Sequence, residues 1–375
     1  MTFVSSPTSF CFSGLIWRDN RLQQGTIHIE EGRIKSGRRG RVVKVPYILP
    51  PFADPHLHGG WGASFEDGDF GYLELKLKKS GVFLAIPTLS AADLSHIRQV
   101  ALSFQEYVSQ RKESVFPFLR MEGPFISEGK KGAQEGRFIQ KIEPERVDHF
   151  LSIPQIKIFT FAPEIDGSSE LAKRALALDK IPSVGHSQGT LKDFDRVYKL
   201  GVRHITHYPN ALSPLHHREL GLVGAGLLYD NLQLEVIGDG IHTSFEFLEL
   251  LLKVKGPTFA LISDLIPPAY APPEDDSGQK YNIQGKKIMS PGGVLMGGGT
   301  SVPEQVVQLK KKGWPVEVLI KVASENARLF LNYSPGNIAE GSQANFLLCG
   351  ENLEVWAVFE KGQCLFWGEA LHRKI

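Results

Sequence analysis

Two histidines stand two residues apart near the start of the chain, within the run from Asp54 to Gly60. On a strand, residues i and i+2 point the same way, so His56 and His58 would direct two imidazoles to one point, as a metal ion requires. The adjoining Gly59 and Gly60 leave room for a close approach. The alternative is a pair of polar residues at a strand end, but the spacing favours a metal site.

Three further side chains of the ligand type follow short apolar runs later in the chain. Glu122 is either a ligand to a hard or borderline cation or a member of a surface ion pair. His186 and His207 each follow a predicted strand, and two such histidines indicate ligands rather than packed core residues. His204 is an odd number of residues from His207, so it is expected to face the other side and to have a structural role.

An acid, Asp264, ends the otherwise apolar segment that begins at Phe259. A carboxylate in that position is costly unless it is paired or functional. Next to a metal-activated water it could act as general base and then as general acid. A helix cap or an ion pair is the alternative.

Two loops carry groups that could contact a polar substrate. Arg218 lies in a basic cluster and suits bidentate contact with a phosphate or carboxylate, although a solvated charge run fits it equally well. Asp239 and His242 bring a histidine to another strand end, or else form a capped turn. Lys130 and Lys131, by contrast, are expected to lie in a solvated turn.

The segments that position these residues alternate between short apolar runs and stretches with helical spacing, which indicates βα units and a parallel sheet. Helical spacing occurs at Leu94 to Val108, Ser169 to Leu178, Leu191 to Leu200 and Phe245 to Val254. Eight units over roughly 285 residues predict an α/β fold, a (β/α)8 TIM-type barrel with catalytic groups at the C-terminal strand ends. The predicted strands are Tyr47 to Phe52, Val82 to Pro87, Val115 to Met121, Ile156 to Phe161, Ile181 to Val184, Val202 to Thr206, Leu232 to Ile237 and Phe259 to Ile262.

Both ends of the chain read as strands and turns rather than as βα units. Thr26 to Glu30, Arg33 to Lys35 and Arg41 to Val45 alternate or are strand-like near the start. Ala344 to Leu348 and Val355 to Phe359 do so near the end, as does Gln363 to Phe366. We therefore expect a small β-sandwich domain from residues 1–48 and 336–375, and a catalytic barrel from residues 49–335.

Composition limits the classes of partner. The 375 residues include 42 Lys+Arg against 41 Asp+Glu, a formal net charge of +1, which favours neither nucleic acid nor an anionic membrane as the main partner. Three cysteines in no CxxC pair fit a reducing cytoplasm better than a disulfide framework. We expect no secretory signal and no membrane span, and hence a cytoplasmic protein with a small-molecule substrate.

The motifs together resemble the N-acetylglucosamine-6-phosphate deacetylase family of the amidohydrolase superfamily, in order and over nearly the whole chain. The run from Thr206 to Gly224 is the most specific part of the resemblance. The other matching pieces are Asp54 to Gly60, Met121 to Phe125, Lys130 to Ala133, Gly185 to Ser187, Asp239 to His242 and Ser263-Asp264.

The resemblance implies a role for each matching residue. A metal would be held by Glu122, His186 and His207, and a second ion by His56 and His58. Asp264 matches the family's catalytic acid/base. Arg218 matches a phosphate contact that can reach a neighbouring subunit's site, which implies a homodimer. The positions that match sugar contacts are Ala133, Gln134, Asn210, Ala211, Asp239, His242, Leu295, Met296 and Gly297.

The activity implied is hydrolysis of the N-acetyl group of N-acetylglucosamine 6-phosphate, in amino-sugar catabolism, with one or two divalent ions of zinc, iron, manganese or cobalt. The chain departs from the family pattern at Gln134, where histidine is common, and at Leu265 to Pro268. These departures bear on the acyl group and the sugar. Alternatives are an amidohydrolase acting on another acylated sugar phosphate or a cyclic amide, and a non-catalytic sugar-phosphate binding protein.

Overall fold

The computed structural model describes residues 10–271 and 281–372, and its centre is a sheet of eight strands that follow one another in chain order. All the neighbouring pairs whose registers are resolved run parallel. Asp264 N–H donates to the His56 carbonyl over 2.9 Å, and His58 N–H donates to the Leu265 carbonyl over 2.7 Å, so the residues that follow the last strand bond to the end of the first. The strands are β5 (Phe52–Leu57), β8 (Val82–Ser90), β9 (Leu119–Glu122), β10 (Ile156–Phe161), β11 (Ile181–Val184), β12 (His204–Ile205), β13 (Gln233–Ile237) and β14 (Ala260–Ile262).

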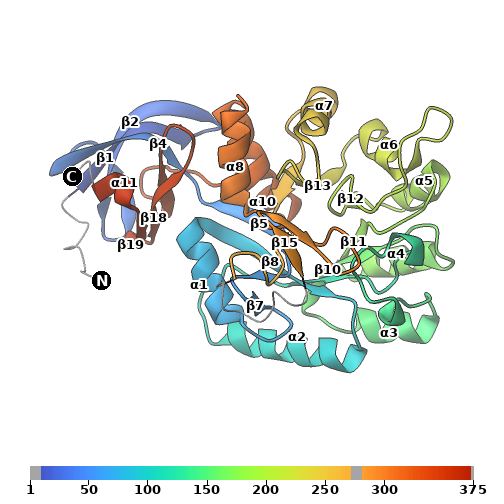
Figure 1. The fold of residues 1–375 in the computed structure, drawn as a ribbon. Coiled ribbons are helices and arrows are strands. Elements are labelled where there is room, and N and C mark those ends of the chain that lie inside the picture. Colours follow the sequence, from blue (N-terminus) through green and yellow to red (C-terminus); the bar gives the residue numbers. More distant parts are fainter. Residues whose placement is uncertain (1–9, 272–280, 373–375) are drawn as a thin grey trace. The chain divides into compact units, whose positions relative to one another are not determined.

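Helices alternate with these strands along the chain (Figure 1). Their sequences carry the expected start signals. Thr190 accepts a bond from the Asp193 amide while Asp193 accepts one from the Thr190 amide, a capping box that starts α5. The helices are α1 (Phe70–Ser80), α2 (Leu94–Ser109), α3 (Pro144–Leu151), α4 (Ser168–Ala177), α5 (Leu191–Lys199), α6 (Gly221–Leu228), α7 (Phe245–Lys255), α8 (Val302–Lys311), α9 (Val316–Ile320), α10 (Asn326–Phe330) and α11 (Glu369–His372).

The predicted barrel is confirmed, and most predicted strands overlap their observed counterparts. The first one is wrong. The segment from Tyr47 to Leu49 ends β4, a strand of the other large sheet, and the barrel strand is β5. The cause lies in Pro50 and Pro51 between them, because proline has no N–H to donate to a sheet ladder. His56 therefore lies within its strand rather than after it.

A second sheet is built from both ends of the described chain, as expected. Its seven strands lie in the order β19-β18-β17-β4-β1-β2-β3, and all resolved pairs are antiparallel except β1 with β4. At Gly14 a Cβ atom would lie 2.2 Å from the Val45 carbonyl oxygen, so only glycine fits this close pairing. The strands are β1 (Phe10–Arg18), β2 (Arg21–Glu30), β3 (Arg33–Ser36), β4 (Arg41–Leu49), β17 (Phe346–Cys349), β18 (Val355–Glu360) and β19 (Gln363–Trp367).

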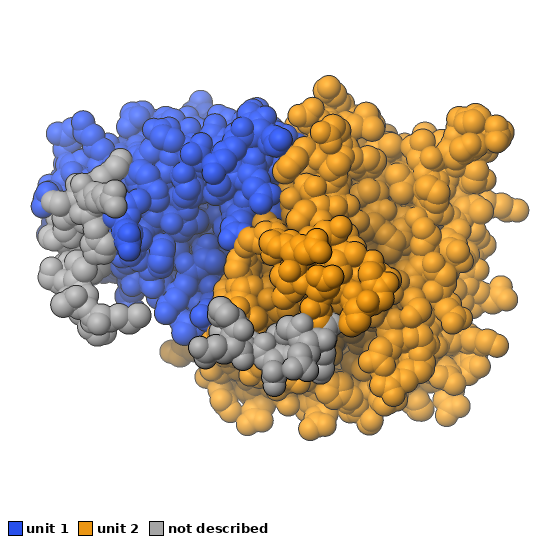
Figure 2. Space-filling view, in the orientation of Figure 1, with its two compact units in different colours: residues 1–53, 75–84, 302–375 blue, residues 54–74, 85–301 orange. Residues whose placement is uncertain are grey.

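By their internal contacts the residues group into two units, which Figure 2 colours separately. The first comprises residues 1–53, 75–84 and 302–375, and the second comprises residues 54–74 and 85–301. The domain boundaries at 48/49 and 335/336 stay a prediction. Two small hairpins belong to the second unit, β6 (Gly59–Gly60) with β7 (Ala63–Ser64) and β15 (Asn282–Gln284) with β16 (Lys287–Met289).

A polar, turn-rich connection from Pro267 to Gly285 is long enough to suggest a lid or binding loop. Residues 272–280 of it lie outside the described part of the structure. None of the helices in the described ranges combines the length and the apolar character that crossing a membrane would require.

Candidate metal centre and active site

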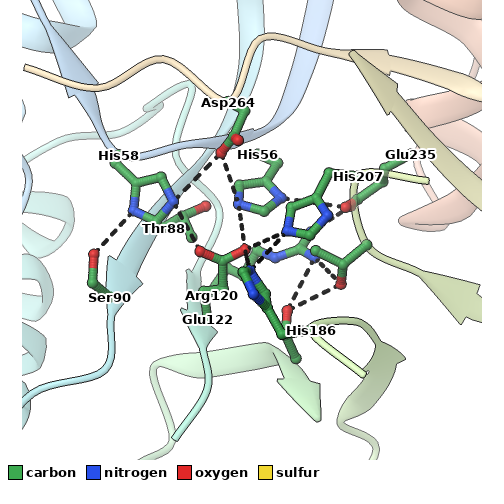
Figure 3. Close-up of polar contacts among 12 residues, drawn as sticks. His56, His58, Thr88, Ser90, Arg120, Glu122, His186, His207, Glu235 and Asp264 are labelled. Atoms are coloured by element: carbon green, nitrogen blue, oxygen red, sulfur yellow. Dashed lines mark hydrogen bonds and ion pairs between the residues drawn. The ribbon is translucent and has the colours of Figure 1, made fainter. Parts of the chain in front are cut away.

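The six predicted metal-site and acid/base residues meet at one end of the barrel, and Figure 3 shows their side chains pointing toward one another. They come from the C-terminal ends of different strands, as a barrel of this kind places its chemistry. Glu122 is the last residue of β9, His186 lies two residues beyond β11 and His207 two beyond β12. His56 and His58 come from the end of β5, and Asp264 lies two residues beyond β14.

The tightest part of this cluster contains Glu122, His186 and His207. The Glu122 Oε1 atom lies 2.8 Å from His207 Nε2 and 3.1 Å from His186 Nε2, and the two nitrogens are 3.0 Å apart. A tetrahedral ion with bonds of about 2.0–2.1 Å has edges of roughly 3.3 Å between its ligand atoms. The three atoms thus form a triangle close to one face of such a site.

The second ring nitrogens of these histidines fix their tautomers. His186 Nδ1 contacts the Lys130 carbonyl oxygen over 2.7 Å, and His207 Nδ1 contacts the Asn210 carbonyl oxygen over 3.2 Å. A carbonyl can only accept, so both Nδ1 atoms carry hydrogen and both Nε2 atoms of the neutral rings present lone pairs. In that neutral state three electron-rich atoms converge, so a positive charge is needed between them, and a divalent cation fits.

His56 and His58 line the other side of the cluster. His56 Nε2 lies 3.6 Å from Glu122 Oε1, and His58 Nε2 lies 3.4 Å from Glu122 Oε2. His56, His58 and Glu122 offer ligand atoms within 4.8 Å of one another, and so do Glu122, His186 and His207. Glu122 is shared by both groups, so the donor set suits one cation or two.

Asp264 faces this cluster. Its Oδ1 atom lies 3.3 Å from His56 Nε2 and 3.5 Å from His58 Nε2. The Oδ1 and His56 Nε2 atoms are both buried, and neither has a hydrogen-bond partner among the described residues. Two facing polar atoms left in this state are typical of a site completed by an ion or water.

The acids of the site set its electrostatics. Burial by itself would raise the pKa of Glu122, but the charge of His186 and bonds from the surrounding histidines hold it well below its usual range. Burial would lower the pKa of His58, and the carboxylates of Asp264 and Glu122 instead raise it to about 10. The two carboxylates therefore stay ionised and attract positive charge, supplied by protons or by a cation.

Several of these residues hold an unusual backbone conformation. The φ angle is +45° at His186, +29° at His207 and +52° at Asp264, and the substrate candidate Ala211 has +54°. Residues with side chains rarely adopt positive φ, and such strain gathers at functional sites. The backbone turns back at each strand end and directs the side chain across the barrel mouth.

A buried polar layer lies beneath the cluster. Arg120 and Glu235, whose side chains are fully buried, form an ion pair, and Glu235 Oε2 lies 3.4 Å from His56 Nδ1. Arg120 also donates to Thr206 over 2.8 Å. This layer gives His56 the outer partner that a ligand histidine needs, and we did not predict it. The signal was present as charged residues inside otherwise apolar strand segments.

His204 belongs to the same layer. Its Nδ1 lies 2.9 Å from the Ser183 hydroxyl and its Nε2 lies 3.5 Å from Glu235 Oε1. The expectation that it faces away from His207 is therefore wrong. Both side chains point into the barrel, and His204 lies deeper, in the polar layer beneath the cluster. His207 turns toward the cluster through its positive φ, which alternation along a strand does not anticipate.

A cavity of about 650 Å³ opens onto the cluster. Lys130 also lines it, although we expected a solvated turn there, and it is the one Lys or Arg side chain among the lining residues of the described chain. Glu66, Ser90 and Tyr281 are further lining residues that the sequence did not single out. The predicted substrate positions that line it are Ala133, Gln134, Asn210, Ala211, His242, Leu295, Met296 and Gly297.

Two predicted substrate residues lie outside the lining. Asp239 accepts from the His242 ring over 2.8 Å, so it orients that histidine, whose other nitrogen lies 2.7 Å from the Met296 carbonyl. Both acceptors favour the protonated ring, and the pKa of His242 is raised because these bonds outweigh its burial. Arg218 is exposed and contacts the His217 ring over 3.0 Å.

Comparison with known proteins now places the chain. It is 33% identical to the N-acetylglucosamine-6-phosphate deacetylase of Thermotoga maritima, whose crystal structure matches with a TM-score of 0.82 over 94% of this chain and 98% of that one. The chain belongs to the N-acetylglucosamine-6-phosphate deacetylase family. A scan against models of protein families finds no match.

Other relatives are less identical to the chain but match it over nearly their whole lengths. The N-acetylglucosamine-6-phosphate deacetylase of Bacillus subtilis is 27% identical over 94% of this chain and 95% of its own. The N-acetylgalactosamine-6-phosphate deacetylase of Escherichia coli O157:H7 is 25% identical over 93% of this chain and 98% of its own. Enzymes named for two epimeric sugars are thus similar in sequence to this chain over most of its length.

Proposed function

We propose that this chain removes the acetyl group of N-acetylglucosamine 6-phosphate, giving acetate and glucosamine 6-phosphate, in amino-sugar catabolism. One observation carries the proposal. The ligand atoms of Glu122, His186 and His207 converge beside the buried carboxylate of Asp264. All four residues line one cavity, which is large enough for a sugar phosphate. Family membership supplies the substrate class.

The residues suited to a first divalent ion are Glu122, His186 and His207, whose ligand atoms lie closest together. His56 and His58 would hold a second ion together with the shared Glu122. Nitrogen and carboxylate donors suit zinc, iron, manganese and cobalt alike. A divalent cation bound here would act as a Lewis acid toward the amide carbonyl and would favour deprotonation of water.

Asp264 is the residue placed to move protons. Its buried Oδ1 atom forms no hydrogen bond within the described residues and lies 3.3 Å from His56 Nε2 and 3.5 Å from His58 Nε2, so it is placed to accept the proton of an attacking water. Water adds to the amide carbon, and the C–N bond then breaks as Asp264 returns the proton to the departing nitrogen. The His242 ring, held by Asp239, is placed to donate to the substrate once it leaves the Met296 carbonyl.

The phosphate requires cationic contacts. Lys130 supplies one from within the cavity of the same chain. Arg218 is exposed and is not among the residues that line the cavity of its own chain, so it would need a different way to reach a phosphate. We infer that Arg218 contacts the phosphate bound to a neighbouring subunit, in a homodimer.

The decisive experiment joins metal analysis of the purified protein to acetate release. We expect one or two equivalents of divalent metal, loss of activity with a chelator and recovery when metal returns. N-acetylglucosamine 6-phosphate should be preferred strongly over the unphosphorylated sugar. A metal-free native protein, or equal rates on the two sugars, would contradict the proposal.

N-acetylgalactosamine 6-phosphate is a second candidate substrate, because a full-length relative bears that name at nearly the same identity. The two sugars differ only in the orientation of one hydroxyl, at C4. Parallel measurements of kcat/KM on both compounds separate the candidates. A higher value for the galactosamine compound would transfer the proposal to that substrate and leave the metal site unchanged.

A further inference from the structure

A short segment after β9, from Glu128 to Gln134, touches two of the metal-site residues from outside. The carbonyl of Lys130 receives the Nδ1 hydrogen of His186 over 2.7 Å. The side-chain amide of Gln134 donates to Glu122 Oε2 over 2.7 Å. One seven-residue stretch therefore contacts both a histidine and the shared carboxylate of the cluster.

The orientation of the Gln134 amide is fixed by its other end. Its Oε1 atom accepts the backbone N–H of Ala91 over 3.0 Å, and a backbone N–H can only donate. The Nε2 atom must therefore be the one that faces Glu122. The residue is 8% exposed, and its main chain is tied to Lys131 through two further bonds. Gln134 is thus a fixed donor rather than a mobile surface amide.

Because of this donor, the two oxygens of the Glu122 carboxylate have different partners. Its Oε2 atom takes the Gln134 bond and lies 3.4 Å from His58. Its Oε1 atom is thereby turned toward His186 and His207. A carboxylate oxygen has two lone pairs, so the Gln134 bond still leaves Oε2 one site for a cation. The other contacts of the carboxylate come from the candidate ligands His58, His186 and His207, whereas the Gln134 bond holds it from outside that set.

We propose that Gln134 is a positioning residue for the metal centre, which holds Glu122 in its ligand orientation, rather than chiefly a contact to the sugar as its place in the family motif implied. The inference rests on the metal site of the proposed function. Outer partners of metal ligands typically contribute 10–100-fold to metal affinity. Gln134 is the outer partner of the one residue that both candidate sites share.

The test is the zinc affinity of the metal-stripped protein, measured by competition with a chromophoric chelator. Gln134→Met keeps the length of the side chain and removes its donor and acceptor, and we expect zinc to bind 10–100-fold more weakly. Gln140→Met is the matched control, because Gln140 lies in the same region but does not line the cavity. It should bind zinc within twofold of the wild type.

A second variant covers the case in which Gln134→Met fails to fold. Gln134→Asn keeps the amide but is too short to reach Ala91 and Glu122 together, so it should also lose zinc affinity. The zinc-induced rise in Tm should shrink in both variants. Zinc affinity within threefold of the wild type, combined with a raised KM for the sugar phosphate, would overturn the inference in favour of a substrate contact. A wild type that binds no zinc or other divalent ion would instead refute the proposed function itself.

Discussion

The interiors of the two sheets are filled in opposite ways. The barrel interior beneath the site holds a buried ion pair, Arg120 with Glu235, surrounded by hydroxyl groups such as Thr206. The seven-stranded sheet packs on a core of apolar side chains in which the rings of Phe346 and Phe359 lie 4.6 Å apart. Burying polar groups costs free energy, whereas apolar burial stabilises. The difference shows that the barrel interior serves the site as well as the fold.

The polar layer has a definite target. Glu235 contacts His56, and Ser90 contacts His58 over 3.4 Å, so both histidines of the pair receive an outer partner. In the other sheet, the ring of Phe359 packs on the rings of Phe12, Phe346 and Trp367 of the same sheet. Substitutions in the barrel layer should therefore alter both stability and chemistry, while those in the aromatic core should alter stability alone.

The largest effect is expected at Asp264, where the barrel's chemistry is concentrated. In Asp264→Asn the side chain keeps its size but cannot accept the proton of the attacking water. We expect kcat to fall by about 10³-fold, within the usual contribution of general acid–base catalysis. Metal content, measured on the same samples, should stay unchanged. Near-normal turnover with metal bound would remove Asp264 from its role.

The next effect tests the polar layer itself. Arg120→Met leaves the Glu235 carboxylate buried without its cation, which should destabilise the protein by about 4 kcal/mol in denaturant unfolding. The double variant Arg120→Met/Glu235→Leu removes both charges and should regain most of this loss. It should nevertheless bind metal more weakly, because His56 loses its outer partner. Full metal affinity in the double variant would show that the layer serves stability alone.

The aromatic core provides the counterpart. Phe359→Ala removes a fully buried ring that packs on Phe12 and Phe346. We expect a loss of about 3 kcal/mol in the free energy of unfolding, with kcat and KM unchanged below the unfolding transition. If kcat fell as well, the separation between the two interiors would not hold.

The smallest effect is expected at the rim of the cavity. Lys130→Met removes the lysine that lines it, and the KM for the phosphorylated sugar should rise about tenfold, or ~1.4 kcal/mol. The rate on the unphosphorylated sugar should not change. Lys141→Met, an exposed lysine outside the cavity lining, is the control. If both variants raised KM equally, the effect would come from the overall charge of the protein and not from a contact between Lys130 and the phosphate.

The barrel strands and the cluster residues could be predicted from the sequence wherever a local pattern allowed a single interpretation. The strands from Ile156 to Phe161 and from Ile181 to Val184 match at both ends, because short apolar runs were bounded by polar turns. The cluster residues were found because each follows such a run. The first barrel strand was misplaced because apolar residues continue through Pro50 and Pro51.

Other features depend on contacts between residues that are far apart in the sequence, and no local sequence pattern indicates them. The pairing of Arg120 with Glu235 joins residues 115 positions apart. The bond from Gln134 to Glu122 depends on where a loop folds back, and motif comparison alone indicated a sugar contact. The exposure of Arg218 follows from the path of its loop, whereas its proposed contact lies on another chain.

The left-handed backbone at His186, His207 and Asp264 has a consequence for protein engineering. Glycine would relax each of these positions, so a screen for thermal tolerance alone would reward its substitution there. The same changes would delete two candidate ligands and the candidate proton acceptor. At these three positions a substitution that raises thermal stability should lower hydrolytic activity. Variants selected for heat resistance should therefore also be assayed for hydrolysis.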